Sequence, residues 1–275
     1  MADDKKQEEF KLVKLFRPLN TEMSTEAKSK AMNEDNVSYT LTYFKLSAMA
    51  STARDLLAYG KVNWKNNLLD VATWQQEPVA TPFGYMPMLE IHNSTGEGVV
   101  ICEQMVVDLY LAKKFKLLGK NDYEDTVIQA IYSAAQSVRE RYSVGVAWTG
   151  ENNKERALDI FLRAHFPKWL EATEKVLLDN VKHGGAAGYF VGNELTLAEI
   201  HVANIIDHFS HQPPGKKTLA LIPKDSLIWK AKAHVEAQPE IKAWRQSEEY
   251  QSCIQSSNTL YKVTFPNWVE DETSH

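Results

Sequence analysis

The sequence predicts two units in tandem, an α/β unit over residues 38–118 and an all-helical unit over residues 122–262. Two observations predict this division. Segments with a two-residue apolar period alternate with helical segments before Gly119, and the apolar period is helical almost throughout after it. A largely polar extension, residues 1–37, precedes the first unit, and residues 263–275 form a C-terminal tail.

The first unit has the order strand, helix, strand, linking segment, strand, strand, helix. The segments that predict it are SYTLTYF (38–44), MASTARDLLAYG (49–60), KVNWKNNLLD (61–70), a loosely helical stretch after Trp74, PMLEI (87–91), GVVIC (98–102) and EQMVVDLYLAKKF (103–115). β-branched and aromatic residues favour the strands, and Gly60 and the turn-rich HNSTGEG mark boundaries.

The second unit consists of amphipathic helices. They are predicted over residues 125–142, 155–179, 196–209, 225–238 and 239–250. Thr196 and Glu199 in GNELTLAE form the pattern of a capping box at the start of the third of these helices. In the extension, Leu12, Leu15, Phe16 and Leu19 could form one apolar stripe that docks on the body or on a second subunit, and a solvated extension is the alternative.

Composition excludes several classes of protein. The chain of 275 residues is 44% hydrophobic with a net charge of -5, which suits a soluble globular protein and gives no basic face for nucleic acid. Cys102 and Cys253 are far apart, so neither a disulfide framework nor a zinc site is indicated. The start MADDKKQEEF has no secretory pattern and no apolar run reaches membrane-spanning length, so we expect a cytoplasmic protein with no membrane contact.

The segment TPFGYMPMLE puts Pro87 at the entrance to a predicted strand. Proline has no backbone N–H for a ladder, so its place suggests an edge or a site where the backbone serves another purpose. A proline before the third strand of this element order is the pattern of the thioredoxin fold, in which that proline is cis. The backbone of Met86 would then pair with an extended peptide.

Several segments together resemble the cytosolic glutathione transferases, most closely the Sigma class. They are YTLTYFKLSAMASTARDLLAYG, Trp74, TPFGYMPMLE, ICEQMVVDLYLAKKFKLLG and GYFVGNELTLAEIHVANI, and the resemblance covers residues 38–255. It implies an α/β thioredoxin-like N-terminal domain followed by an all-α C-terminal domain. It also implies glutathione as co-substrate, small hydrophobic electrophiles as second substrates, and a homodimer.

The resemblance implies that Tyr43, at the end of the first strand, stabilises the glutathione thiolate, with Ser47 as the backup donor. A hydrogen bond to a charged group contributes about 1.5 to 3 kcal/mol, which is enough to lower the thiol pKa by about two units. Without the resemblance, Tyr43 would be interpreted as a strand residue packed on the sheet.

The resemblance also implies the residues that bind glutathione. Met86 and Pro87 would meet its cysteinyl backbone, Trp74 its glycyl end, and Glu103 and Gln104 its γ-glutamyl group at a helix N-terminus. A packing role for Trp74 is the alternative.

Four residues depart from the family pattern. Gln104 replaces a small hydroxyl residue, and Met49, Pro78 and Tyr85 stand where basic residues are usual. Because glutathione is anionic, each lost charged contact is expected to weaken binding by about 1 kcal/mol or more.

We expect Met49, Tyr142 and Trp148 to line an apolar electrophile pocket between the domains, with a helix-core role as the alternative for the two aromatic residues. His201, His208 and His211 could hold a metal, but imidazoles at a helix end or dimer surface are commoner, so we expect no metal site. The predicted function is a glutathione transferase conjugating glutathione to hydrophobic electrophiles. The alternatives are a protein of this fold that binds ligands or partners with weak or no catalysis, and an isomerase or peroxidase that uses the same thiolate.

Overall fold

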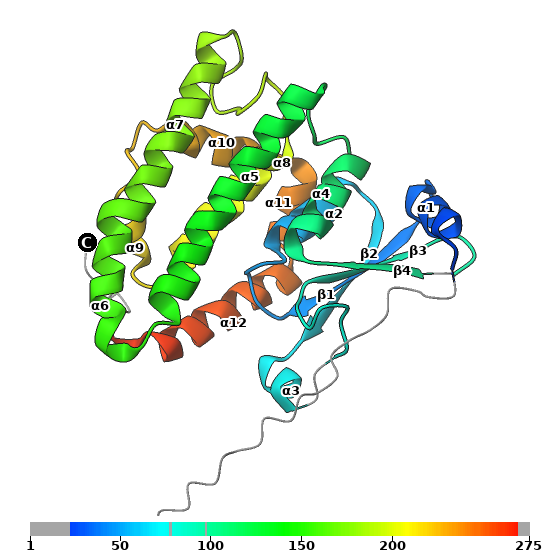
Figure 1. Cartoon of the computed structure of the whole chain (residues 1–275), viewed down its shortest axis with the longest axis horizontal. Coiled ribbons are helices and arrows are strands. Elements are labelled where there is room, and N and C mark those ends of the chain that lie inside the picture. Colours follow the sequence, from blue (N-terminus) through cyan, green and yellow to red (C-terminus); the bar gives the residue numbers. More distant parts are fainter. Residues whose placement is uncertain (1–22, 77–78, 97, 269–275) are drawn as a thin grey trace, which may run out of the picture.

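The structure is a computed structural model, and it describes residues 23–76, 79–96 and 98–268. The predicted apolar stripe of residues 12–19, and Pro78, lie outside these ranges. The chain forms a small sheet domain beside a larger helical domain, with the sheet seen edge-on at the right of Figure 1.

Four strands form one mixed sheet in the order β2-β1-β3-β4. Their bounds are β1 (Ser38–Phe44), β2 (Asn63–Leu69), β3 (Met88–His92) and β4 (Gly98–Cys102). β2 is parallel to β1, β3 is antiparallel to β1, and β4 is antiparallel to β3. Together with the helices that follow β1 and β4, this confirms the predicted thioredoxin-like unit and its predicted strands to within two residues.

The sheet domain has helices on both sides. α2 (Ser51–Tyr59) and α4 (Gln104–Lys114) lie between the sheet and the helical domain, whereas α3 (Val71–Gln76) lies on the opposite side (Figure 1). The helix α1 (Thr25–Asn33), which the sequence did not predict, packs beside β3 and β4. The Tyr110 hydroxyl donates to the carbonyl of Met32 at 2.9 Å, so part of the predicted extension docks on the body.

The helical domain begins at α5, after a short linker. Its helices are α5 (Asp122–Tyr142), α6 (Glu151–Ile160), α7 (Phe166–Lys182), α8 (Leu197–His211), α9 (Gly215–Leu219), α10 (Leu227–Glu236), α11 (Pro239–Arg245) and α12 (Glu248–Thr264), with π-helical turns at Ser143–Ala147 and Phe161–His165 and a 3₁₀ turn at Pro266–Trp268. The predicted single helix over 239–250 is wrong. The chain breaks before Ser247, whose hydroxyl accepts from the backbone N–H of Tyr250 at 3.2 Å and begins α12.

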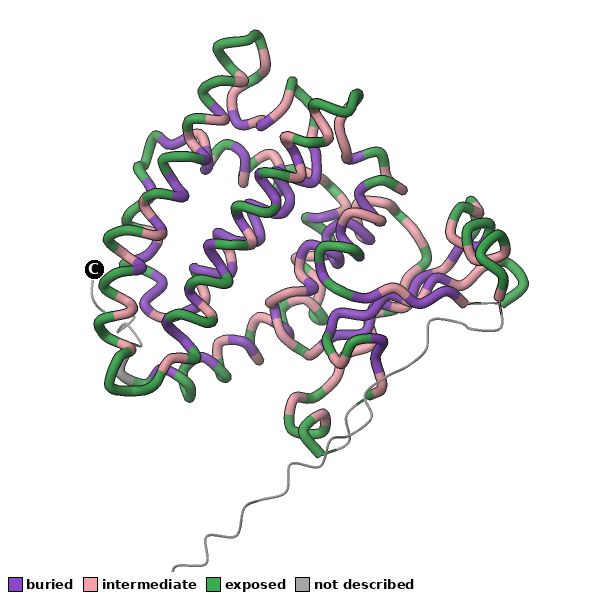
Figure 2. The backbone as a smooth tube through the Cα atoms, viewed as in Figure 1, coloured by how far each residue is buried: buried purple, intermediate pink, exposed green. Residues whose placement is uncertain are grey.

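Burial follows the faces on which the domains meet (Figure 2). α8 is buried along most of its length, and one contiguous apolar core runs from the sheet through α2 and α4 into α5 and α8. The predicted capping box is confirmed: Glu199 accepts from the backbone N–H of Thr196 at 2.7 Å, and the Thr196 hydroxyl accepts from Ala198 at 3.2 Å.

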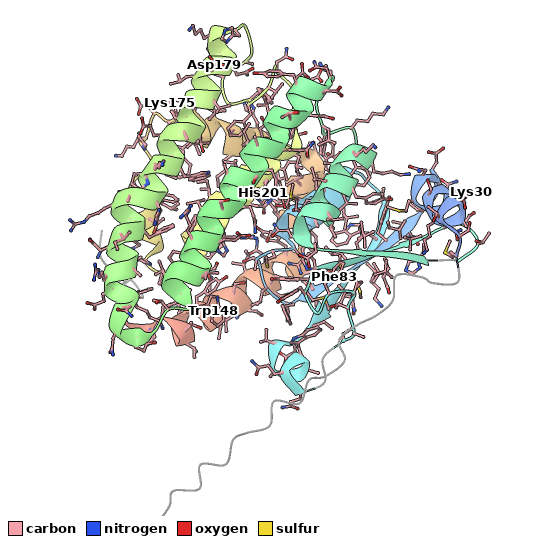
Figure 3. All side chains as sticks on the ribbon, in the orientation of Figure 1. Lys30, Phe83, Trp148, Lys175, Asp179 and His201 are labelled. Carbon is pink, nitrogen blue, oxygen red and sulfur yellow. The ribbon has the colours of Figure 1, made fainter. Side chains whose placement is uncertain are left out.

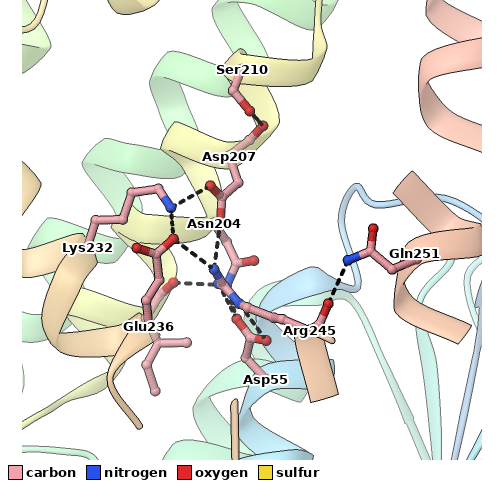
Figure 4. Close-up of polar contacts among 9 residues, drawn as sticks. Asp55, Asn204, Asp207, Ser210, Lys232, Glu236, Arg245 and Gln251 are labelled. Carbon is pink, nitrogen blue, oxygen red and sulfur yellow. Dashed lines mark hydrogen bonds and ion pairs between the residues drawn. The ribbon is translucent and has the colours of Figure 1, made fainter. Parts of the chain in front are cut away.

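An ionic cluster joins the two domains (Figure 4). Arg245 of α11 lies 2.6 Å from Asp55 of α2 and 2.9 Å from Asp207 of α8, and Lys232 of α10 lies 2.9 Å from Asp207. Asn204 of α8 also donates to Asp55 at 2.9 Å. Because the Asp55 side chain is only 1% exposed, its charge depends on these partners.

Arg245→Gln tests this cluster. Removing the guanidinium leaves the buried Asp55 carboxylate uncompensated, so we expect the free energy of unfolding to fall by about 3 to 5 kcal/mol. Urea unfolding measures the loss. The matched control is Arg163→Gln, which breaks an exposed arginine–aspartate pair with Asp159 and should cost about 1 kcal/mol or less. Equal losses in the two variants would contradict the assigned role.

Candidate functional site

The strand register brings most of the predicted site residues to one end of the sheet. Thr42 pairs with Met88, and Met88 pairs with Cys102. Carried one residue further, this register aligns Tyr43, Pro87 and Glu103 across three neighbouring strands. The Met86–Pro87 bond is cis, as predicted, and Met86 precedes the first residue of the β3 ladder.

Tyr43 lies buried at the end of β1, with 5% of its surface exposed. Its hydroxyl oxygen accepts from the backbone N–H of Met49 at 3.4 Å. Burial raises the pKa of Tyr43, and the nearby Arg139 and Arg54 lower it in part. The phenol therefore keeps its proton at neutral pH and can donate it in a hydrogen bond to an anion.

Arg54 holds the turn that follows Tyr43. Its guanidinium donates to the carbonyls of Leu46 at 2.6 Å and Phe44 at 3.1 Å, and it lies 5.7 Å from the centre of the Tyr43 ring. Arg54 is 2% exposed, so these hydrogen bonds form in a low-dielectric interior where they are strong. Arg54 thus holds the turn in place and packs beside the Tyr43 ring, which fixes the position of the phenol.

Ser47, the predicted backup donor, is bound by the C-terminal helix. Both its backbone N–H and its hydroxyl lie near the hydroxyl oxygen of Ser257 on α12, at 2.8 Å and 3.1 Å. Ser47 therefore connects the turn to α12, a contact between residues 210 positions apart. The Ser47 hydroxyl already donates its proton to Ser257, whereas the Tyr43 hydroxyl accepts from Met49 and keeps its own proton for another acceptor. Ser47 is therefore a poorer candidate than Tyr43 for a thiolate donor.

Trp74 packs beside the same turn. It lies on α3, and its ring meets that of Phe44 edge-on with the centres 5.6 Å apart. Asp70 stabilises the start of α3 by accepting from the backbone N–H of Thr73 at 3.0 Å. The indole is only partly buried, so it can both support Phe44 and contact a ligand.

The junction of β4 and α4 has an unusual backbone. Glu103 has φ 71° and ψ 124°, a conformation that a residue with a side chain rarely adopts and that costs about 1 to 3 kcal/mol. Its side chain is exposed, whereas Gln104 is 5% exposed. Strain of this kind concentrates at functional sites, and here it presents Glu103 beside the N-terminus of α4.

Gln104 turns inward, away from the site that the sequence predicted for it. Its amide oxygen accepts from Arg139 of α5, and its amide nitrogen lies 3.5 Å from a carboxylate oxygen of Asp108. The Tyr132 hydroxyl donates to the same oxygen of Asp108 at 2.8 Å. The long side chain is thus used within the protein, and the start of α4 lacks the small hydroxyl that the family pattern has there.

Asp108 is completely buried. Burial raises the pKa of its carboxyl group to about 7, and the hydrogen bonds from Tyr132 and Gln104 and the charge of Arg139 oppose this only in part. The buried network formed by Asp108, Gln104, Tyr132 and Arg139 therefore changes its net charge near neutral pH.

The structure does not assemble the predicted electrophile pocket from all three residues. Met49 lies in the turn beside Tyr43, but Trp148 is 80% exposed where the chain leaves α5 (Figure 3). Tyr142 is buried, its hydroxyl donates to the carbonyl of Pro213 at 2.6 Å, and its ring packs on Phe161. Tyr142 thus has the helix-core role given above as the alternative.

The three histidines have separate surroundings. His201 lies inside the domain interface (Figure 3), 3.0 Å from the Thr52 hydroxyl, and stacks on Tyr132 at 3.8 Å. His208 is buried, whereas His211 is partly exposed. No cluster of three or more possible metal ligands occurs within the described ranges, and no helix in them is long and apolar enough to cross a bilayer.

Reasoning from sequence missed the buried polar residues of the site, chiefly Arg54, Asp108 and Arg139. A signal was present: Arg139 follows Tyr132 and Ala135 on the inward face of α5, and Asp108 lies among Val107 and Leu111 on that of α4. A charged residue on an apolar face is unusual enough to indicate a buried partner or a ligand.

Known proteins are similar to this chain in sequence and in fold. Residues 136–248 match the family described as "Glutathione S-transferase, C-terminal domain". The chain is 30% identical over 179 residues to "Probable glutathione S-transferase 6" of Caenorhabditis elegans, spanning 62% of this chain and 82% of that protein. It is 29% identical over 208 residues to "Glutathione S-transferase S1" of Drosophila melanogaster, spanning 75% of this chain and 77% of that protein.

A solved structure of prostaglandin synthase D of Nilaparvata lugens superimposes with a TM-score of 0.65 at 22% identity. The superposition covers 77% of this chain and 98% of that one. At this identity the likeness shows the fold alone, and the Sigma-class assignment stays a sequence-based prediction.

Asp108→Asn tests the buried network. Between the usual carboxyl pKa of 3.8 and the raised value of about 7, the folded chain binds more protons than the unfolded one, so stability falls as pH rises through this window. The amide removes this dependence. Between about pH 5 and about pH 8, we expect the free energy of unfolding of wild type to fall by about 2 kcal/mol or more relative to that of the variant, as measured by urea unfolding. Asp35→Asn, an exposed control, should follow the wild type, and identical pH profiles for all three proteins would refute the assignment.

Proposed function

Because the chain belongs to the glutathione S-transferase family, we propose that it conjugates the thiolate of glutathione to small hydrophobic electrophiles. The observation that supports this most directly is the Tyr43 hydroxyl at the sheet end where Met86–Pro87 and Glu103 also lie. The other support is the set of relatives named glutathione S-transferases.

Tyr43 acts in this proposal as a hydrogen-bond donor to the thiolate. Its oxygen already accepts from the Met49 N–H, which polarises the hydroxyl and strengthens it as a donor. Glutathione gives up its thiol proton to solvent, and the sulfur attacks the electrophilic carbon to form a carbon–sulfur bond. Either a leaving group departs with its bonding electrons, or a carbon–carbon π bond breaks and the neighbouring carbon takes a proton from water. Binding the thiolate before the attack lowers the thiol pKa towards neutral pH.

Glutathione would lie along the entrance to β3. We assign its cysteinyl backbone to Met86 and Pro87, its ammonium group to the exposed Glu103 carboxylate, and its glycyl end to Trp74. Its γ-glutamyl carboxylate would meet the N-terminus of α4, where backbone N–H groups and the helix dipole favour an anion.

A second candidate function is ligand binding with weak or no catalysis. The inward turn of Gln104 favours it, because this removes a side-chain contact from the γ-glutamyl position. Met49 also brings no charge to the turn. Titration calorimetry with glutathione, followed by a conjugation assay, separates the two: binding without conjugation supports the second candidate.

Tyr43→Phe tests the enzymatic proposal. Loss of the hydroxyl should raise the pKa of bound glutathione by about one to two units and slow conjugation at neutral pH about tenfold to a hundredfold, since one hydrogen bond to an anion is lost. The ultraviolet absorbance of the thiolate, followed against pH in the binary complex, measures the pKa. Tyr39→Phe, the same change on the same strand, is the control and should leave the thiol pKa unchanged. An unchanged thiol pKa in Tyr43→Phe, with a raised one in Ser47→Ala, would transfer the role to Ser47.

We also propose a cytoplasmic homodimer. Cys102 and Cys253 are unpaired, which fits a reducing compartment. Support for the dimer comes from exposed apolar residues: Phe83 and Tyr85 expose 63% and 70% of their surfaces in the loop before β3. Met105 and Val106 of α4 expose 42% and 50%.

Phe83→Ser tests the dimer. Removing this large exposed apolar side chain should weaken self-association by about tenfold or more, since well-packed aromatic anchors dominate interfaces. Sedimentation velocity over a concentration series measures the dissociation constant. Val263→Ser, an exposed apolar residue on α12, serves as the control, and an unchanged dissociation constant in Phe83→Ser would place the interface elsewhere.

A further inference from the structure

The turn between β1 and α2, residues 45–50, is held in place by side chains outside it. Arg54 of α2 donates to the carbonyl of Leu46 at 2.6 Å. At the next residue, the backbone N–H and the hydroxyl of Ser47 both donate to the hydroxyl oxygen of Ser257, at 2.8 Å and 3.1 Å. Ser257 lies on α12, which runs from the helical domain to this turn (Figure 1). The turn is therefore held from its own domain by Arg54 and from the other domain by Ser257.

Ser257 satisfies both donors of Ser47. The two serines are buried, with 0% of the surface of Ser257 and 8% of that of Ser47 exposed. A hydroxyl oxygen has two lone pairs, and Ser47 uses both of them. A buried donor without an acceptor is costly. Loss of the Ser257 oxygen would therefore favour a movement of the turn that gives these two donors another partner.

The contact with the turn accounts for a serine on the buried face of α12. That face consists of Cys253, Ser257 and Tyr261, which are four residues apart. Alanine would fill the middle position with a higher helix propensity and without a polar group to satisfy. The Ser257 hydroxyl therefore contributes to the position of the turn rather than to the stability of its own helix.

The same turn carries the backbone group that meets Tyr43. Two residues after Ser47, the backbone N–H of Met49 donates to the Tyr43 hydroxyl oxygen at 3.4 Å, which is near the upper limit for a hydrogen bond. Tyr43 is fixed in the sheet, where it pairs with Leu68 of β2, whereas Met49 lies in the irregular turn. A shift of the turn by a few tenths of an ångström would therefore break this hydrogen bond.

We propose that Ser257 is a positioning residue for the thiolate donor: it fixes Ser47 and thereby holds the Met49 N–H against the Tyr43 hydroxyl. This inference rests on the proposed function, and it adds a residue of the helical domain that acts on the phenol of the sheet domain. A hydroxyl whose oxygen accepts a hydrogen bond is a stronger donor, so loss of the Met49 contact weakens the bond from Tyr43 to the thiolate. Ser257 acts through the turn and contacts neither substrate.

Ser257→Ala tests the inference. We expect the pKa of glutathione bound to this variant to rise by about half a unit to one unit, and kcat at neutral pH to fall about threefold to tenfold. The KM for glutathione should change much less, because its proposed contacts at Pro87 and Glu103 are unaffected. The thiolate absorbance of the binary complex, followed against pH, measures the pKa. Ser252→Ala is the matched control: the Ser252 hydroxyl donates to the carbonyl of Glu249 on the same helix, and its loss should leave the thiol pKa unchanged.

Two further variants separate the contact from a general loss of stability. Ser47→Ala removes one of the two hydrogen bonds and keeps the backbone N–H on Ser257, so it should shift the thiol pKa less than Ser257→Ala does. The double variant should behave as Ser257→Ala alone, since both changes act through one contact. Ser257→Thr keeps the hydroxyl and should retain most of the wild-type value. An unchanged thiol pKa in Ser257→Ala, with stability lowered or not, would overturn the inference and leave the proposed function intact.

Amide hydrogen exchange tests the same contact without glutathione. Exchange at the backbone N–H groups of Ser47 and Met49 should be about tenfold or more faster in Ser257→Ala than in wild type, and unchanged in Ser252→Ala. If wild type does not lower the thiol pKa of glutathione, the proposed function fails, and faster exchange still supports the hold of α12 on the turn. Unchanged exchange overturns it. If Ser257→Ala does not fold, Ser257→Cys, whose sulfur is a weaker acceptor, takes its place in both measurements with the same expected directions.

Discussion

The fold of the site depends on three polar residues close together on α2, each buried and each bound to a different part of the molecule. Arg54 holds the carbonyls of the turn after β1, Thr52 meets His201 of α8, and Asp55 meets Arg245 of α11. Because one short helix makes all three contacts, the turn beside Tyr43 cannot shift without disturbing the docking of the helical domain. The position of the Tyr43 hydroxyl is thus coupled to the packing of the two domains.

This coupling explains why so many buried polar groups gather at one interface. An interface between two domains brings together side chains whose partners come from the other unit, and α12 adds Ser257 against the turn and Tyr261 beside His208. Each such group costs desolvation free energy that an apolar residue of similar size would not. The interface is therefore less stable than an apolar interface of the same size would be. Its polar contacts are directional, so they favour a single arrangement of the residues around Tyr43.

The sequence predicted the sheet, because its strands depend on local patterns, and it predicted which residues lie at the sheet end where we propose the site. Alternation located β1 and β2, and the family motifs pointed to Tyr43, Pro87 and Glu103, which the strand register aligns. The break before α12 and the helix α1 were missed, since their sequences are polar and have weak apolar periods. The inward turn of Gln104 could not be predicted either. Periodicity indicates the helix face on which a residue lies, but it does not identify a hydrogen-bond partner such as Arg139, which is 35 residues away.

Arg139 of α5 belongs to a network of buried polar side chains that spans the two domains. Its guanidinium donates to the amide oxygen of Gln104, the amide nitrogen of Gln104 lies 3.5 Å from a carboxylate oxygen of Asp108, and Tyr132 donates to that same oxygen. Each of these side chains is buried, so each depends on the others to offset the cost of its desolvation. A small hydroxyl residue at position 104 could not reach Arg139, and the guanidinium would then lose this partner. The inward turn of Gln104 is therefore a requirement of the buried network, and the missing hydroxyl at the start of α4 follows from the packing of the two domains.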